Sequence, residues 1–370
     1  MPKHLILVGG GHAHMVTLAN LHRFIEKGHK VTVIGPSEYH YYSGMGPGML
    51  GKTYTPDDIR FATRHVVEKR GGRFIKAKVD RIDPAAKTVY LESDETIPYD
   101  VLSFNAGSYV PSPHIEGDQK DIFPVKPIER LMEAQTRLIH LMEEKTITIG
   151  IVGGGPSSAE IAGNVWGLAH DQGLNKPVIY IFAGHKFMSR FPAGVRHKVT
   201  RSLTRRKIEI LEDSYVERIE TGRVVLASGQ KHELDFIFLA SGVKPSPIFK
   251  ASGLLTGPDG GLLVNQYLQS TEHPDLFGGG DCIYFKDQPL DKVGVYAVRE
   301  NPVLYHNLMA KLEGEALMPF DPGGDYLLIF NLGGGSGVLR KQWFQFGGHL
   351  AFTIKNYIDL KFMRKFQAIE

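Results

Sequence analysis

Short apolar runs that end in glycine alternate with segments of helical pattern along most of this chain. The first run, Leu5–Val8, leads into Gly9, Gly10 and Gly11, and a helical segment at 15–27 and a second apolar run at 31–34 follow. Short apolar runs bounded by turn residues are typical of buried strands. The pattern therefore predicts a strand, a glycine turn, a helix and a second strand, beginning close to residue 1.

The same arrangement recurs in the middle of the chain. An apolar run at 147–152 leads into Gly153, Gly154 and Gly155, a helix is expected from 159 to about 170, and another strand at 178–182. In dinucleotide-binding folds such glycines allow a tight turn and close approach to a pyrophosphate, which the helix N-terminus attracts. One such turn is weak evidence, but an internal repeat predicts two dinucleotide sites. Alternatively, the second unit keeps only the fold.

Both units depart from the usual motif. His14 and Ser158 stand in the third glycine positions, and neither second strand ends in the acidic residue that usually binds a ribose hydroxyl. Glu38 lies a few residues beyond the first unit. Lys186 and Arg190 lie beyond the second, where they suit a 2′-phosphate or are ordinary surface charges. The second unit is therefore compatible with binding either NADH or NADPH.

Other strand ends also point toward a bound cofactor. We expect a loop at 40–50, a meander of short strands at 73–104 and an amphipathic helix at 127–144. A strand at 100–104 and another that begins at 236 each run into a turn of small residues. Asp281 follows a glycine-rich strand end, where it suits a ribityl hydroxyl or simply caps a turn.

Composition narrows the class of protein. The chain has 370 residues, 42% of them hydrophobic, which is enough for two or three domains with large cores. Its single cysteine, Cys282, excludes an intrachain disulfide and a cysteine-rich metal site and suits the cytoplasm. A net charge of +3 gives no reason to expect nucleic-acid binding. The sixteen histidines lack metal-ligand spacing, so we expect no metal site.

The C-terminal segment combines apolar and basic residues. Ile354, Ile358, Phe362 and Phe366 recur every fourth residue, and the charges between them are Lys355, Asp359, Lys361, Arg364 and Lys365. This pattern predicts a helix on a membrane surface or against a partner, or a terminal helix whose apolar stripe packs on the body. Trp343, Phe344 and Phe346 precede it. We see no signal peptide or membrane span, so any membrane contact would be peripheral.

Five stretches in this order resemble the flavoproteins of the pyridine nucleotide-disulfide oxidoreductase superfamily. They are Gly9–Gly11, Asn105–Ser108, Gly153–Gly155 with Glu160, Leu239–Gly242 and Phe277–Asp281. The resemblance implies an α/β fold with two Rossmann-like dinucleotide-binding domains, the glutathione reductase-like FAD/NAD(P) fold, plus a C-terminal segment. Residues 1–112 and 245–320 would form the FAD-binding domain, 113–244 the NAD(P)-binding domain and 321–370 the C-terminal segment.

The resemblance also implies the binding residues. For FAD these are Gly9, Gly11, His12, Ala13, Ser37, Ala106, Gly107, Asp281, Val295 and Tyr296. For NAD(P)H, the expected co-substrate, they are Gly153, Gly155, Pro156, Ser157, Glu160 and Gly242. By the same likeness, a helix that begins within 292–299 would direct its N-terminal end at the flavin. No catalytic acid or base is assigned.

Within the superfamily the chain looks most like the type II NADH dehydrogenases and the flavoprotein domain fused to selenide, water dikinase. The resembling stretches are 9–14, 42–48 and 292–299. Disulfide reductases and sulfide:quinone oxidoreductases need at least two cysteines, which this chain lacks. The resemblance implies electron transfer from NAD(P)H through FAD to a quinone, with peripheral contact at the inner face of the cell membrane through residues 350–366. A soluble reductase of a small redox protein and a flavin-binding redox sensor are the alternatives. The sequence is compatible with either a monomer or a homodimer.

Overall fold

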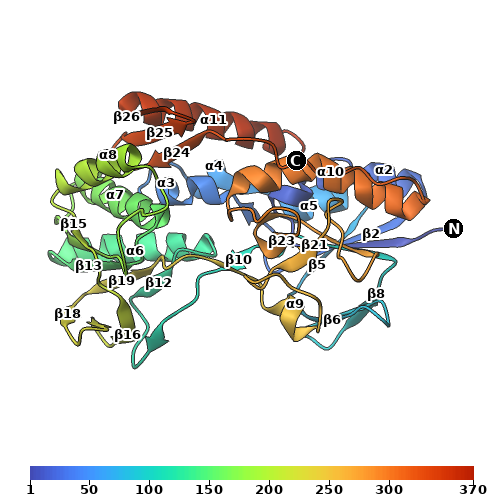
Figure 1. The fold of residues 1–370 in the computed structure, drawn as a ribbon, viewed down its shortest axis with the longest axis horizontal. Helices are drawn as coiled ribbons and strands as arrows, with labels where there is room; N and C mark the ends of the chain where they lie inside the picture. The colour runs from blue at the N-terminus through green and yellow to red at the C-terminus, as the bar shows by residue number, and fades with distance from the viewer.

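The computed structural model describes all 370 residues and has two lobes, each built on a five-stranded parallel sheet (Figure 1). In the first sheet the order is β22-β9-β1-β2-β5, and Leu5 pairs with both Val31 and Val101. Its strands are β1 (His4–Val8), β2 (Lys30–Gly35), β5 (Arg73–Lys76), β9 (Val101–Phe104) and β22 (Leu276–Gly278). The inner strands β1, β2 and β9 are mostly apolar and buried because both faces of a parallel sheet are covered.

Short helices and a meander complete the first lobe. The predicted helix at 15–27 is divided at Asn20 and preceded by a 3₁₀ turn, and the predicted meander is shorter because β5 and β9 belong to the parallel sheet. The elements are η1 (His12–His14), α1 (Met15–Ala19), α2 (Leu21–Glu26), α5 (Thr63–Lys69), β6 (Val79–Asp83), β7 (Thr88–Leu91), β8 (Thr96–Pro98), α9 (Ile248–Ala251), β21 (Leu262–Val264), η3 (Gly280–Cys282), β23 (Ile283–Phe285) and α10 (Gly294–Glu313).

The second sheet repeats the arrangement in the order β12-β19-β13-β14-β15. Its strands are β12 (Ile122–Pro124), β13 (Thr148–Val152), β14 (Val178–Phe182), β15 (Glu209–Leu211) and β19 (Phe236–Leu239). Around it lie α6 (Glu129–Glu144), α7 (Pro156–Asp171), α8 (Ala193–Thr204) and a small sheet of β11 (His114–Ile115), β16 (Val216–Glu220), β17 (Arg223–Leu226) and β18 (Lys231–Glu233). Separate cores of 42 and 49 buried residues lie around the first and second sheets, so each lobe has its own interior.

The chain crosses between the lobes twice at one place. β10 (Ser108–Tyr109) pairs antiparallel with β20 (Lys244–Pro245), so the outgoing and returning segments lie side by side. Residues 40–50, expected to be a loop, instead form β3 (His40–Tyr41), η2 (Ser43–Met45) and α3 (Gly46–Leu50). Pro47 stands in the first turn of α3, where its missing N–H costs nothing. β4 (Arg60–Phe61) pairs with β3, and α4 (Pro56–Ile59) precedes it.

The C-terminal segment spans both lobes along one side of the molecule (Figure 1). β24 (Leu328–Asn331), β25 (Gly337–Lys341) and β26 (Phe344–Gly348) form an antiparallel sheet, and α11 (His349–Gln367) lies across it. The C-terminal half of the predicted apolar stripe of α11 turns toward the body, since Phe366 is buried and Phe362 packs against both cores. Ile358, in the same stripe, is 40% exposed. Lys355 and Asp359, expected among the surface charges, are buried as well. None of the helices has the length and apolar character needed to cross a bilayer.

Candidate flavin and nucleotide site

A cavity of about 970 Å³ lies between the two lobes and is closed on one side by α11. This volume is at the upper end of the roughly 300–1,000 Å³ typical of ligand pockets. Its walls come from the first glycine turn, the turn after β9, residues 39–44, residues 126–129, the start of α7, residues 292–299, β24 and α11. The cavity therefore gathers segments that are hundreds of residues apart in the sequence.

The first glycine turn has no room for side chains. Gly9 has a φ of +89°, and a Cβ there would lie 2.3 Å from the carbonyl oxygen of Asn105. At Gly11 a Cβ would lie 2.1 Å from the side-chain oxygen of Asn105. The Asn105 amide in turn donates to the Gly279 carbonyl at 2.7 Å, so three strand ends are joined around the turn.

His14, in place of the third glycine, is a structural residue. Its ring nitrogens contact the Gly9 carbonyl at 2.7 Å and the Ser103 hydroxyl at 2.8 Å. Burial lowers the pKa of His14 to about 4, so the ring is neutral at pH 7. The hydrogen bonds hold the turn to β1 and β9, in place of the close helix–strand contact that glycine would allow.

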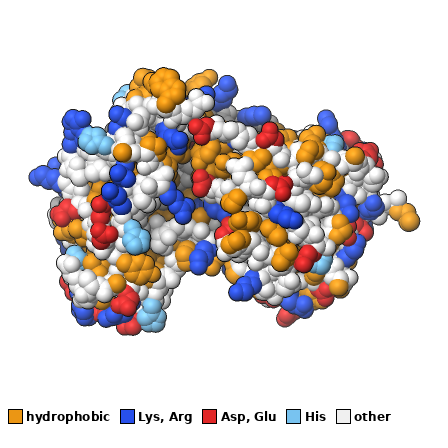
Figure 2. Space-filling model, viewed as in Figure 1, with side chains coloured by type: hydrophobic (Ala, Val, Ile, Leu, Met, Phe, Trp, Pro, Cys, Tyr) orange, Lys and Arg blue, Asp and Glu red, His pale blue; other side chains and the backbone are white.

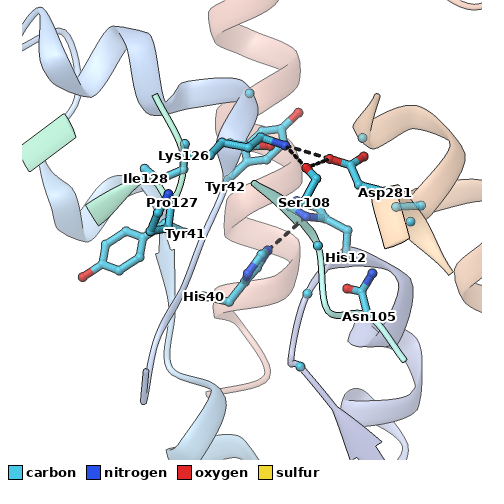
Figure 3. Close-up of a pocket in the computed structure, with 18 of the residues that line it drawn as sticks. His12, His40, Tyr41, Tyr42, Asn105, Ser108, Lys126, Pro127, Ile128 and Asp281 are labelled. Carbon is cyan, nitrogen blue, oxygen red and sulfur yellow. Dashed lines mark hydrogen bonds and ion pairs between the residues drawn. The ribbon is translucent and has the colours of Figure 1, made fainter. Parts of the chain in front are cut away.

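His12 belongs to an aromatic group at the cavity wall (Figure 3). Its Nδ1 lies 3.0 Å from Nε2 of His40, and its ring stacks on Phe362 at 5.5 Å with Tyr42 at 5.0 Å. Burial lowers the pKa of both imidazoles, that of His40 to about 4. Nε2 of His12 is buried without a protein partner, which is costly for a polar atom.

Asp281 is held by a lysine that sequence analysis did not identify. Its carboxylate accepts from Lys126 Nζ at 2.7 Å and from the Ser108 hydroxyl at 2.6 Å (Figure 3). Burial alone would raise the pKa of Asp281, but Lys126 and Ser108 together hold it below its ordinary value. Lys126 follows β12 and Ser108 lies in β10, so the group joins the FAD-side strand end to the crossing between the lobes.

A second charged group lies beneath α11. Lys355 donates to Asp359 at 2.6 Å and to the Gly44 carbonyl at 2.9 Å, and Tyr42 donates to the other Asp359 oxygen at 3.2 Å. Glu160, on the first turns of α7, accepts from the Asn331 backbone N–H at 2.8 Å. Burial raises the pKa of Glu160 to about 7. The cavity wall thus contains a carboxyl group that can carry a proton near neutral pH.

The structure brings most of the expected FAD residues to the cavity. Eight of the ten line it: Gly9, Gly11, His12, Ser37, Ala106, Gly107, Asp281 and Val295. Ala13 is fully buried behind the turn, and the Tyr296 ring packs against Tyr326. Glu38, considered for the ribose, instead pairs with Arg64 at 2.8 Å.

The expected NAD(P)H residues are divided. Pro156, Ser157 and Glu160 line the same cavity, whereas Gly153, Gly155 and Gly242 do not. A Cβ at Gly153 would lie 2.1 Å from the Ala240 carbonyl oxygen, while Gly155 and Gly242 have open space beside them. Lys186 and Arg190 form no ion pair with any acid of the chain. These assignments stay predictions.

The residues of the cavity fit FAD. The backbone of Gly9, Gly10 and Gly11 lines the cavity, His12 carries an unpartnered nitrogen in the wall, and one carboxylate oxygen of Asp281 accepts no hydrogen bond. No thiol reaches the cavity. The Cys282 thiol is buried and donates to the Gly279 carbonyl at 3.3 Å, and burial raises its pKa to about 12.

Comparison with known proteins agrees with this geometry. Residues 3–309 match the family described as pyridine nucleotide-disulphide oxidoreductase. The chain is 24% identical to a type II NADH:quinone oxidoreductase of Staphylococcus epidermidis, covering 99% of this chain and 96% of that protein. It is 23% identical to the oxidoreductase ptaL of Pestalotiopsis fici, covering 98% of each.

Two solved structures share the fold. NDH2 of Plasmodium falciparum in complex with NADH superposes with a TM-score of 0.83 at 14% identity, covering 100% of this chain and 96% of that one. The sulfide:quinone oxidoreductase of Aquifex aeolicus gives 0.79 at 19% identity, covering 100% and 92%. These matches confirm the predicted α/β fold with two Rossmann-like domains. The family match confirms FAD as the cofactor and NAD(P)H as the co-substrate. The chain belongs to the pyridine nucleotide-disulphide oxidoreductase family.

Proposed function

We propose that this protein oxidises NAD(P)H and passes the electrons through FAD to a quinone. The observation that carries the proposal is Glu160, a carboxyl group in the cavity wall whose pKa is raised by burial to about 7. Reducing a quinone takes up two electrons and two protons, and a proton donor with a pKa near the working pH suits that reaction. Leu328, Ile329, Ile358 and Phe362 supply the apolar wall.

The residues of the chain bind and orient rather than react. FAD supplies the electron-transfer chemistry when bound. The turn at Gly9–Gly11 and the N-terminal ends of η1 and α10 favour the negative charge of a pyrophosphate and of the flavin ring. Asp281 is fixed by Lys126 and Ser108, so that its carboxylate can accept from the ribityl chain. Cys282 is buried and tied to backbone carbonyls, which supports an acceptor reaction without a protein thiol.

We further propose peripheral contact with a membrane through the outer side of the C-terminal segment. The turn between β25 and β26 exposes Trp343 by 86% and Phe344 by 50%, and Leu350 and Tyr357 project from α11 beside it. Figure 2 shows hydrophobic side chains gathered at the upper edge of the molecule, over this segment. Aromatic side chains flanked by cations suit the surface of an anionic bilayer.

Cations lie on both sides of this apolar surface. α8 carries Arg196, Lys198 and Arg201 and no acidic residue, and none of the three forms an ion pair. α8 packs against the hairpin, because a Cβ at Gly194 would meet the Gln345 side chain at 2.0 Å. Lys361, Arg364 and Lys365 are exposed on α11. We therefore propose that the membrane contact lies on the hairpin and the outer face of α11, and not on the apolar stripe of the helix.

Stopped-flow absorbance of the flavin tests the reaction. We expect NADH or NADPH to bleach the flavin, a soluble ubiquinone or menaquinone analogue to restore its colour, and sulfide to have no effect. Glu160→Gln removes the proton donor, so it should slow the restoration by about 100-fold. Lack of bleaching by either nucleotide, or restoration only by a small iron–sulfur protein, would contradict the proposal.

A further inference from the structure

The charged group beneath α11 contains a cation that does not pair with Glu160. Lys355 and Asp359 are one helical turn apart and expose only 7% and 4% of their surface. Both oxygens of Asp359 are used, one by Lys355 at 2.6 Å and the other by Tyr42 at 3.2 Å. Lys355 also donates to the Gly44 carbonyl at 2.9 Å, which ties it to η2.

Glu160 lies near this group but outside it. It lines the same cavity as Lys355 and Asp359, accepts a hydrogen bond from Asn331 N–H, and forms no ion pair with Lys355. Lys355 and Asp359 act on it in opposite directions, since the ammonium lowers the pKa of Glu160 and the Asp359 carboxylate raises it. Tyr42 is also close enough for the Glu160 carboxylate to contribute to its raised pKa.

We propose that Asp359 is a positioning residue that holds the Lys355 ammonium against the Gly44 carbonyl and thereby leaves Glu160 free to exchange protons with a molecule bound in the cavity. Without Asp359 the nearly dry Lys355 ammonium would need another anion, because a buried cation without a partner is strongly disfavoured. Glu160 lines the same cavity, and Lys355 is the cation that acts most strongly on it, so Glu160 is the carboxyl group that we expect to take that place. The resulting ion pair would keep Glu160 ionised and unable to donate.

The inference rests on the proposed function in its last step. NAD(P)H gives up a hydride, which is two electrons and one proton, and leaves as NAD(P)⁺, and the quinone gains two electrons and two protons to become a quinol. One further proton comes from water, and Glu160 donates it and is protonated again from solvent. Asp359 takes no part in the transfer and only keeps Lys355 away from the donor.

Three variants separate positioning from catalysis. Asp359→Asn keeps the hydrogen bond to Tyr42 but removes the charge, so Glu160 should titrate at least one pH unit lower. Lys355→Met should make Glu160 titrate at a higher pH than in the wild type. The double variant removes both charges, and we expect it to restore titration near pH 7 even if either single variant folds poorly. Glu68→Gln, in the exposed i,i+4 pair with Arg64 at 3.0 Å, is the matched control.

Two measurements on the FAD-loaded protein report the titration. The first is the infrared band of a protonated carboxyl group, taken as the difference between each variant and the same variant with Glu160→Gln, from pH 5 to 9 without substrate. The second is the pH profile of flavin reoxidation by a soluble quinone analogue. We expect both to shift together in Asp359→Asn and neither to shift in Glu68→Gln.

The outcomes distinguish this inference from the proposed function. An infrared titration that is the same in wild type and Asp359→Asn would overturn the positioning role, even if quinone is reduced normally. If the infrared band shifts as expected but no quinone restores the flavin, the placement of Lys355 by Asp359 stands and the quinone acceptor is wrong.

Discussion

Single residues in the cavity wall have effects that follow from their partners. Asp281 and Lys126 expose 15% and 23% of their side chains, so each depends on the other for much of its solvation. Asp281→Asn leaves the Lys126 ammonium without a carboxylate, and we expect the free energy of unfolding at pH 7 to fall by roughly 2–4 kcal/mol. Urea unfolding of the FAD-loaded protein measures this change.

The effect of Asp281→Asn on the free energy of unfolding should depend on pH in one direction. The folded-state pKa of Asp281 lies below its ordinary value, so its contribution to stability is complete above the unfolded pKa of about 3.9. This contribution is lost as the pH falls through the folded-state pKa of Asp281. The difference in free energy of unfolding between wild type and Asp281→Asn should therefore be constant from pH 7 to about 5. It should become smaller below about pH 4. Glu92→Gln, in an exposed pair with Lys78 at 3.8 Å, should change stability by less than about 1 kcal/mol at any pH. A difference in free energy of unfolding that stays constant down to pH 3 would contradict the stabilising role of the Asp281 carboxylate.

At the scale of elements, α11 joins the two lobes through its inward stripe. Phe362 packs on His12 at 5.5 Å, Tyr42 at 5.2 Å and Phe366 at 4.8 Å. Phe362→Ala should therefore lower the free energy of unfolding by roughly 2–4 kcal/mol. Tyr357→Ala, on the outer face of the same helix, should change it by less than about 0.5 kcal/mol. Equal effects in urea unfolding would mean that the stripe does not pack as the structure shows.

The sequence of α11 was compatible with either orientation. Its apolar residues recur every fourth position, and this period is the same for a helix on a membrane and a helix on a protein core. Lys355 and Asp359 are the residues that distinguish the two, because their opposite charges at i,i+4 within an apolar helix can neutralise each other when buried. The partner that makes this burial stable is the carbonyl of Gly44, 311 residues away.

At the scale of the whole molecule, the parts of the fold that sequence could predict are local. Each glycine turn is specified by neighbouring residues, so the sequence alone predicts Gly9, Gly11 and Asp281 as FAD-binding residues. All three line the cavity, and their contact with FAD stays a prediction. His40, Lys126 and Asp359 were not assigned, because each belongs to the site only through partners far along the chain. Lys126 meets Asp281 across 155 residues, and no pattern near Lys126 marks that contact.

The membrane proposal also belongs to this scale, since it depends on how the lobes present the C-terminal segment. Trp343→Ser with Phe344→Ser removes the two exposed aromatic rings of the hairpin, and each ring is worth about 1.5 kcal/mol or more when buried. We expect at least about tenfold weaker binding to vesicles with anionic lipid. Binding of the wild type should weaken as salt rises, because α8 and α11 contribute through charge.

Vesicle flotation with two further variants isolates the hairpin. Tyr215→Ser removes a ring that is 63% exposed on the second lobe, and it should bind vesicles as the wild type does. Phe362→Ala should also leave binding unchanged, because its side chain faces the cavity wall. If Phe362→Ala abolishes flotation while the double hairpin variant does not, α11 must leave the body to insert its stripe. The membrane would then bind the helix by opening the cavity, and quinone entry and membrane binding would be one event.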